Sequence, residues 1–430
     1  MNAPQEITPM PRTLRLRLTL LAMISLAATA PHTFAQLAQV PATAPAALSS
    51  PAPAERHRRG QYTLAQPGVP ALLWLEARLN LNEPSDAQTT ADIRSGKQKW
   101  SVQDARQPQE TWDVCVPRSY APGLPHGILV YINAGDSGAT PEAYRPLLEK
   151  YHLLGIGANN SGNQHDVAMR IAHALYAVQL LRQRYDIAPE RIYLFGLSGG
   201  GRVATRILLF YPEIFTGGMP VVGTNFYLPL KLADGRTSPG FWENPDPRRL
   251  NLARRNVRIA FLEGEKDPNR EQTWLAYEAY RNDGFQFVTF LEQEKLGHDL
   301  PAPDWFARGL KFLDEPLRDK ARKSFVHAQQ LYQRHQLGAA LQAYHLAYAH
   351  GPDEDYNPQA RARLLELTRQ YRRDAAAFHA QMQANPAPAR AAEISARFQA
   401  QWGPHADADI QAATGKTPAT HPVQEPNNGG

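Results

Sequence analysis

The chain has 430 residues, of which 43% are hydrophobic, so it is long enough to bury at least one large core. It carries 46 Lys and Arg residues against 41 Asp and Glu residues, and no basic stripe is interleaved with aromatic residues; this pattern gives no support to a nucleic-acid-binding protein. The single cysteine, Cys115, excludes an internal disulfide framework.

The amino-terminal residues have the pattern of a secretory signal peptide. Three arginines precede the apolar run Leu18–Ala28, and the residues that follow suit cleavage after Ala35. The run is too short to span a membrane, and an amino-terminal anchor that is never cut is the alternative. We therefore expect a signal peptide over residues 1–35, no stable membrane span, and a secreted or periplasmic protein.

The next two segments lead up to the predicted sheet. Residues 36–59 are dominated by Ala and Pro, which predicts an extended linker without a core. Residues 60–111 contain weaker strand signals, and we expect them to form an amino-terminal β extension that packs on the sheet.

Two polar loops follow strand patterns in the middle of the chain. The apolar run at 127–132 ends in the loop Asn133–Gly138, whose backbone amides could donate to an anion. The polar run 158–166 follows the next strand pattern, and its Asn side chains could bind substrate, although Asn and Gly are also ordinary turn residues. The candidate anion donors and substrate contacts in these loops are Ala134, Gly135, Asn159, Asn160 and Asn163.

The most specific motif lies within residues 191–202, where an apolar strand pattern changes abruptly into a helical pattern. At this change Gly196, Ser198 and Gly200 give the G-x-S-x-G spacing of a nucleophile elbow. In such an elbow the serine occupies a strained turn and its hydroxyl projects above the sheet. We predict Ser198 as a nucleophile and the amide of Gly199 as an oxyanion donor.

A serine nucleophile of this type needs an acid and then a histidine further along the chain. The turn after the strand pattern at 256–262 holds Asp267, which we predict to orient the histidine; Glu263 and Glu265 lie in the same turn as rivals. His298 follows a glycine just beyond the next strand pattern, from which an imidazole can reach the serine. We predict His298 as the general base.

With these motifs, residues 112–313 resemble an α/β-hydrolase of the esterase D, feruloyl esterase and polyhydroxybutyrate depolymerase-like group. The chain departs from that pattern at Ala188, where Asp is usual, and at Asn133-Ala134-Gly135, where many esterases have His-Gly. The resemblance implies a doubly wound, mostly parallel sheet and hydrolysis through an acyl-enzyme, without fixing a substrate. The matching segments are Trp112–Tyr120, Tyr185–Tyr193, Gly264–Asp267 and Gly297–Asp299.

Towards the carboxyl end the pattern changes to helix only. Small, aromatic and proline residues between Ala328 and Pro352 fall at the positions of one tetratricopeptide unit, which this segment resembles, and residues 358–383 predict another long helix. Because stacked repeats need several units, the simpler alternative is a helical hairpin packed against a following helix. We expect a small all-helical extension over 314–402 that could bind a protein partner, then a disordered tail over 403–430.

The predicted function is that of a serine hydrolase for carboxylic esters. The short connection from residue 226 to residue 256 leaves no room for a large cap domain, so the ester could be bulky or polymeric, and Phe226 and Tyr227 are further candidate substrate contacts. The alternatives are a serine peptidase of the same fold and a non-catalytic interaction protein that uses the helical segment. The histidines lack metal-binding spacing and Gly196–Gly201 lacks the features of a nucleotide-binding loop, so we expect neither a metal nor a cofactor.

Overall fold

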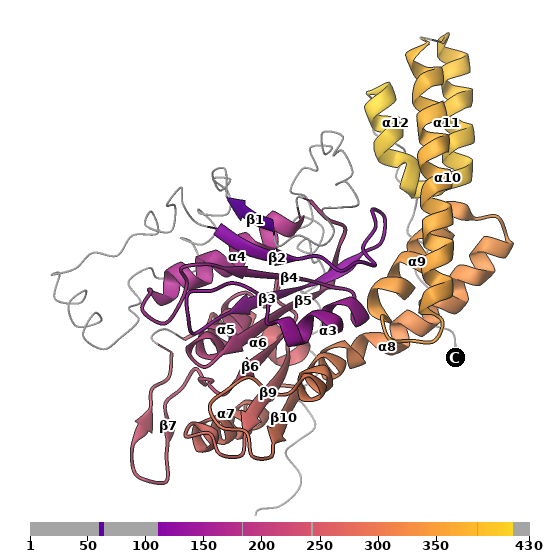
Figure 1. Ribbon diagram of the computed structural model, residues 1–430. Helices are drawn as coiled ribbons and strands as arrows, with labels where there is room; N and C mark the ends of the chain where they lie inside the picture. The colour runs from indigo at the N-terminus through magenta and orange to yellow at the C-terminus, as the bar shows by residue number, and fades with distance from the viewer. Residues whose placement is uncertain (1–59, 64–110, 183, 242–243, 385, 416–430) are drawn as a thin grey trace, which may run out of the picture. The chain divides into compact units, whose positions relative to one another are not determined.

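The computed structural model describes residues 60–63, 111–182, 184–241, 244–384 and 386–415 (Figure 1). The predicted signal peptide, the predicted linker and most of the predicted β extension lie outside these residues. All described residues belong to one compact unit, Ser50–Gly430.

A mostly parallel sheet of eight strands lies at the centre of the described residues, in the order β1-β2-β4-β3-β5-β6-β9-β10 (Figure 1). In this sheet β2 runs antiparallel to both of its neighbours, β1 and β4, and the other neighbouring strands pair in parallel. The doubly wound, mostly parallel sheet predicted from the sequence is therefore confirmed. The strands are β1 (Gly60–Thr63), β2 (Thr111–Cys115), β3 (His126–Ile132), β4 (Leu153–Ala158), β5 (Ile187–Leu197), β6 (Gly217–Val221), β9 (Arg258–Gly264) and β10 (Phe287–Gln293), with β7 (Leu230–Lys231) and β8 (Thr237–Ser238) paired separately.

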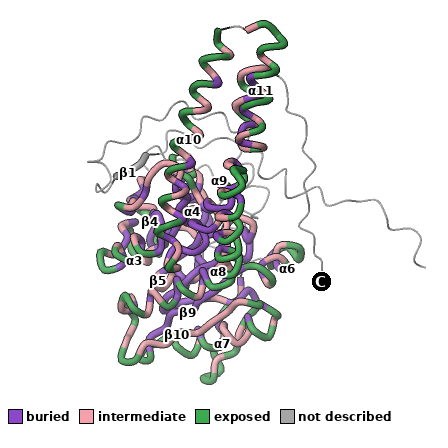
Figure 2. Tube along the Cα trace, turned by 90° about the vertical axis from the view of Figure 1, so that its right-hand side faces the viewer, coloured by how far each residue is buried: buried purple, intermediate pink, exposed green. Residues whose placement is uncertain are grey.

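The strands send alternate side chains into two hydrophobic cores, as the two-residue period of a strand requires. In β3, Ile128 and Val130 face the core that contains α4 to α7, whereas Leu129 and Tyr131 face the core that contains α3 and α8. Figure 2 shows the buried residues gathered in the sheet and in the helices against it. Because helices cover both faces, a site can reach solvent at the strand ends. These helices are η3 (Glu142–Tyr144), α3 (Arg145–Lys150), α4 (Val167–Arg182), α5 (Gly199–Phe210), α6 (Pro247–Asn256), α7 (Arg270–Asn282) and α8 (Pro303–Gln333).

The carboxyl-terminal helices share a hydrophobic core of their own. Tyr344 and Ala347 on α9 are buried in it, and Gly338 on the same helix lies so near α11 that a Cβ there would approach the Trp402 carbonyl oxygen to 1.8 Å. The helices that follow therefore cover the α8–α9 hairpin, in line with the simpler of the two sequence interpretations. These helices are α9 (Leu337–His350), α10 (Asn357–Gln383), α11 (Pro388–Trp402), η4 (Gly403–Ala406) and α12 (Asp407–Thr414).

Two predictions about the carboxyl-terminal region differ from the structure. The predicted boundary after Leu313 falls inside α8, which is one continuous helix whose first half packs on the sheet and whose second half packs on α9. The predicted disordered tail is wrong for residues 403–414, which form η4 and α12. Ala406 and Ile410, one helical turn apart, are buried in the helical core and stabilise this segment. Residues 416–430 lie outside the described part.

A buried arginine joins the extension to the sheet. Arg191 of β5 is fully buried and forms an ion pair with Asp314 of α8, with 2.7 Å between Nε and Oδ1. Its Nη1 also donates to the carbonyl of Ala349 on α9 over 3.0 Å. Nearby, the ring of Tyr348 stacks on His152 at a centroid distance of 4.7 Å. Breaking a buried pair of this kind is costly because it leaves a charge without compensation.

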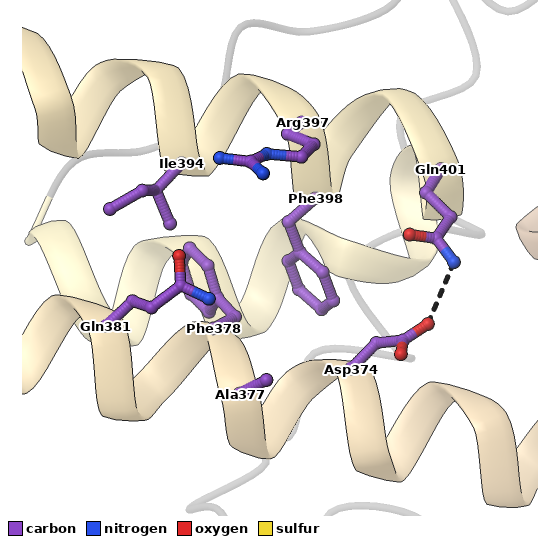
Figure 3. Close-up of a pocket in the computed structure, with 8 residues that line it drawn as sticks. All are labelled: Asp374, Ala377, Phe378, Gln381, Ile394, Arg397, Phe398 and Gln401. Atoms are coloured by element: carbon purple, nitrogen blue, oxygen red, sulfur yellow. Dashed lines mark hydrogen bonds between the residues drawn. The ribbon is translucent and has the colours of Figure 1, made fainter.

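A small cavity of about 150 Å³ lies between α10 and α11 (Figure 3). Phe378, Ile394 and Phe398 form its apolar lining, and at one end Gln401 Nε2 donates to Asp374 Oδ2 over 2.8 Å. The residues that line it include no serine, cysteine or histidine. The nucleophilic and basic side chains that hydrolysis needs lie at the strand ends instead.

Candidate active site

The turn between β5 and α5 holds Ser198 in an unusual backbone conformation. Its φ of 52° and ψ of −115° lie in a region that residues with a Cβ rarely adopt, at a cost of roughly 1–3 kcal/mol. The hydrogen bond from the Ser198 amide to the Val221 carbonyl, 2.8 Å long, holds the turn against β6. Strand and helix meet closely here: a Cβ at Gly196 would lie 2.4 Å from the Gly200 carbonyl oxygen. This is the geometry that the G-x-S-x-G spacing predicts.

The structure brings Ser198, His298 and Asp267 into one continuous chain of contacts. His298 Nε2 lies 2.8 Å from Ser198 Oγ, and His298 Nδ1 lies 2.6 Å from Asp267 Oδ2. The Asp267 side chain is fully buried, whereas the His298 side chain is 40% exposed. Because a carboxylate only accepts, Nδ1 carries the proton in the neutral ring and Nε2 is free to accept from the serine.

The two rival acids have other partners. Glu263 is buried at the end of β9 and accepts the Gly264 amide, and burial raises the pKa of its carboxyl to about 7. Glu265 accepts the Lys295 amide at 2.8 Å. Of the three acids in this turn, Asp267 is the one in hydrogen-bond contact with His298.

The predicted oxyanion donors lie next to the serine. Gly199 is the first residue of α5, so its amide has no acceptor within the helix. The Gly135 amide donates to Asn133 Oδ1 over 3.2 Å, whereas the Ala134 amide makes no hydrogen bond within the described residues. Of the two alternatives from the sequence, this geometry favours Ala134.

The three predicted asparagines differ in what they contact. Asn159 is engaged within the fold: its Oδ1 accepts the Gly138 amide and its Nδ2 donates to Thr111 Oγ1. Asn160 has a φ of 51° and an amide bonded to the Asp136 carbonyl, so it is mainly a turn residue. Asn163 is exposed and adjoins Gly199, because a Cβ at position 199 would lie 2.0 Å from Asn163 Oδ1. Only the side chain of Asn163 lies beside the serine turn.

Phe226 and Tyr227 belong to the core instead. Both are buried, and Phe226 packs edge-on against Tyr280 of α7 at 5.0 Å between ring centroids. The Tyr227 hydroxyl donates to Asp283, which follows the last residue of α7, while Asp267 lies just before its start. A helix of 13 residues is about 20 Å long, so this hydroxyl points away from the triad. This placement argues against their predicted role in substrate binding.

Two residues that the sequence did not single out support the acid. The backbone amide of Asn269 donates to Asp267 Oδ1 over 2.5 Å, and its side chain donates to the Val222 carbonyl over 3.1 Å. Arg202 of α5 in turn donates to Asn269 Oδ1 over 3.4 Å and to Gln272 Oε1 over 2.9 Å. Asn269 stands two residues after the acid, and an Asp side chain often accepts the backbone amide at that spacing, so the sequence could have predicted this contact.

Within the described residues, no cluster of three or more His, Cys, Asp or Glu side chains could hold a metal ion. No helix in the described part of the chain is long and apolar enough to cross a membrane.

Comparison with known proteins finds distant relatives. No family model matches the chain. The oxidized polyvinyl alcohol hydrolase of Sphingopyxis sp. (strain 113P3) is 26% identical over 179 residues, which span 34% of this chain. The match covers 46% of that protein, so the chain spans about half the length of this curated relative.

Solved structures with a similar chain path include three hydrolytic enzymes. Esterase 2 of Thermogutta terrifontis, phosphonylated by cyclosarin, is 16% identical over 48% of this chain and 88% of its own, with a TM-score of 0.36. The S-formylglutathione hydrolase of Staphylococcus aureus is 13% identical over 47% of this chain and 90% of its own, with a TM-score of 0.36. A ferulic acid esterase is 16% identical over 47% of this chain and 88% of its own, with a TM-score of 0.36. Values this low carry no argument about activity.

Proposed function

We propose that the chain is a serine hydrolase that cleaves carboxylic esters through an acyl-enzyme. The observation that carries this proposal is the unbroken contact from Asp267 Oδ2 through the His298 ring to Ser198 Oγ, with distances of 2.6 and 2.8 Å. The hydrolase name of the curated relative supports it as well. An acid, a base and a nucleophile in contact on the ends of three parallel strands give the arrangement that acyl transfer requires.

The mechanism follows from the donors and acceptors of the site. Ser198 Oγ attacks the ester carbonyl carbon while His298 Nε2 takes its proton, and the buried Asp267 carboxylate stabilises the resulting imidazolium. The carbonyl oxygen becomes an oxyanion, to which the amides of Gly199 and Ala134 donate. The intermediate collapses, His298 returns the proton to the leaving alcohol, and the acyl group stays on Ser198. Water then repeats the two steps, with His298 as its base, and releases the acid.

The substrate class rests on the open surroundings of the serine. The residues from 226 to 256 supply two short strands, a few turns and the short helix α6, which is too little chain for a separate cap domain. His298 is accordingly part-exposed. We therefore propose bulky or polymeric esters as substrates, and we propose from the apolar run before Ala35 that the enzyme is exported to the periplasm or the medium.

The decisive experiment is labelling with a fluorophosphonate, which reacts with activated serines. The full chain should be labelled at Ser198 and should hydrolyse p-nitrophenyl esters, whereas Ser198→Ala should lose both while it keeps its melting temperature within a few degrees. Ser324→Ala on α8 is the matched control and should keep both. Labelling of another serine in Ser198→Ala, at the wild-type rate, would refute the assignment. The mature protein recovered from the periplasm or medium should begin at Gln36.

A further inference from the structure

Arg170 of α4 is a buried arginine that connects the two loops beside the serine turn. It is 4% exposed, and all three of its nitrogen atoms donate hydrogen bonds. Nη2 donates to the Asn133 carbonyl over 2.8 Å, at the end of β3. Nε donates to the Ser161 carbonyl over 2.9 Å, and Nη1 donates to Asn163 Oδ1 over 3.2 Å, both in the loop after β4. One planar group thus fixes both loops.

The acceptors of this cation are neutral oxygen atoms, and burying a charge without an opposite charge as its partner costs free energy. Burial lowers the pKa of Arg170 to about 10, with Asp136 opposing the shift, so the group is still a cation at neutral pH. Because none of its three acceptors is a carboxylate, they do not neutralise the positive charge, which therefore acts on the groups around it. Those surroundings are the loop that carries Ala134 and the side chain of Asn163.

The contact with Arg170 also fixes the orientation of the Asn163 amide. Arginine has no acceptor, so the oxygen of Asn163 must face the guanidinium and the NH₂ group must face elsewhere. The amide group lies against Gly199, since a Cβ at that position would be 2.0 Å from Oδ1 and 2.9 Å from Nδ2. A cation on the oxygen side of an amide strengthens its N–H donors. Oδ1 is the nearer of the two atoms to position 199 and faces Arg170, while Nδ2 makes no hydrogen bond within the described residues, so this polarised group is available to donate to a substrate near the Gly199 turn.

A second set of bonds shows that the two loops form one unit. The backbone amide of Asn163 donates to the Ala134 carbonyl over 2.8 Å, and the backbone amide of Gly162 donates to Asp136 Oδ1 over 3.0 Å. Gly162 leaves no space for a side chain, because a Cβ there would lie 2.9 Å from the Ala134 carbonyl oxygen. A shift of either loop would therefore move the Ala134 amide relative to Ser198.

We propose that Arg170 is a positioning residue that builds the oxyanion hole: it holds the loop of Ala134 in place and orients Asn163 as an additional donor to the substrate carbonyl oxygen. This inference rests on the proposed serine hydrolase function. Arg170 touches no substrate itself and acts through the two loops that it joins.

The test compares Arg170→Lys, Asn163→Ala and their double variant, in the full chain, with p-nitrophenyl esters. A lysine keeps the charge but cannot bond three acceptors in one plane. We expect kcat to fall roughly 10- to 100-fold in each single variant, with KM changed less than about threefold, because the interaction is made mainly in the transition state. In the double variant kcat should fall little further than in the worse single variant, because both substitutions affect the side-chain amide group of Asn163.

Arg258→Lys is the matched control for the loss of a buried arginine fork. Arg258 is 3% exposed and donates to the carbonyls of Thr216 and Glu190, at the start of β9 rather than at a strand end near the serine. It should lower the melting temperature and leave kcat unchanged. The proposal is overturned if Arg170→Lys keeps kcat within twofold, or if the two single losses multiply in the double variant. If Arg170→Lys does not fold, exposed Asn163 decides alone: wild-type kcat in Asn163→Ala also overturns it.

The outcome of this test is distinguishable from failure of the proposed function. If the wild-type chain neither reacts with fluorophosphonate at Ser198 nor hydrolyses esters, the function itself is refuted and the inference falls with it. If the wild-type chain does both and the variants match it, only the role of Arg170 is refuted.

Discussion

Both nitrogens of the His298 ring are engaged, one by a fully buried carboxylate and the other by a serine hydroxyl. Burial of Asp267 strengthens its interaction with an imidazolium, because the local dielectric constant is low. The backbone amide of Asn269 holds the second carboxylate oxygen, so Asp267 has little freedom to rotate. The acid therefore acts from a fixed position, which is what control of the histidine tautomer requires.

This geometry predicts a ranking among the three acids of one turn. Asp267→Asn should lower kcat by on the order of 10³- to 10⁴-fold, because an amide in that place favours the wrong tautomer. Glu265→Gln, whose wild-type carboxylate accepts the Lys295 amide, should change kcat by less than about twofold. Steady-state kinetics on the three variants, with Glu263→Gln as the third, checks the ranking. Equal losses in all three would contradict it.

Glu263 should instead affect how stability depends on pH. The pKa of this carboxyl is raised from 4.5 to about 7 in the folded chain, so between these values the folded chain holds a proton that the unfolded chain has lost. The free energy of unfolding must therefore fall as the pH rises through this window, by up to about 3 kcal/mol.

Glu263→Gln removes this titration. Relative to wild type, the variant should gain stability steadily from pH 4.5 to pH 7 and keep a constant advantage above it. Urea unfolding of both proteins at a series of pH values measures the difference directly. If the plots of unfolding free energy against pH stay parallel for the two proteins between pH 4.5 and 7, Glu263 is ionised in the folded chain.

At the scale of elements, the junction of β5 and α5 stores backbone strain at one residue. Ser198→Gly and Ser198→Ala both remove the hydroxyl, but only glycine relieves the cost of the positive φ of 52°. After the entropy that glycine adds to the unfolded chain is counted, Ser198→Gly should be about 1 kcal/mol more stable than Ser198→Ala. Urea unfolding decides between them, and an equal or reversed order would mean that the turn is not strained.

The elements that the sequence predicted well are those set by local patterns. The strand–turn–helix at Ser198 is encoded by glycines and apolar residues within a dozen positions, and the turns of Asp267 and His298 follow recognisable strands. The pairing of Arg170 with Asn133, 37 residues away, has no such pattern, because a polar residue on a predicted helix looks like a solvated one. Tertiary contacts of this kind are decided by packing and cannot be read from spacing.

The errors have the same origin. Phe226 and Tyr227 begin the short connection that was expected to leave the site open, yet their rings are buried in the core and Phe226 packs on Tyr280 of α7. Residues 403–414 have a composition typical of a tail, and they become helical because Ala406 and Ile410 find a hydrophobic core to enter. The change of pattern at residue 313 suggested the end of a domain, but α8 continues through this residue and passes from one core to the other.

At the scale of the whole molecule, the helical extension contacts the sheet region through Ala349 and Tyr348 and supplies none of the proposed catalytic residues. Truncation after Glu315 removes Ala349, an acceptor of Arg191, and Tyr348, which covers His152. We expect the truncated chain to melt several degrees lower but to keep kcat at temperatures where it is folded. Tyr348→Ala in the full chain is the control and should lose less stability. A truncated chain that melts cooperatively yet hydrolyses no ester would show that the helices help to form the site.

The Arg191 pair also sets an order of events while the protein is being made. Asp314 lies 123 residues beyond Arg191, and Ala349 lies 158 residues beyond it. Until both have left the ribosome and, for an exported chain, the export channel, this arginine cannot leave water without a cost of several kcal/mol. Ser198, Asp267 and His298 therefore all emerge before the start of the central strand can close. A nascent chain can hold every reactive group of the site and still have a hydrated gap at the centre of its sheet.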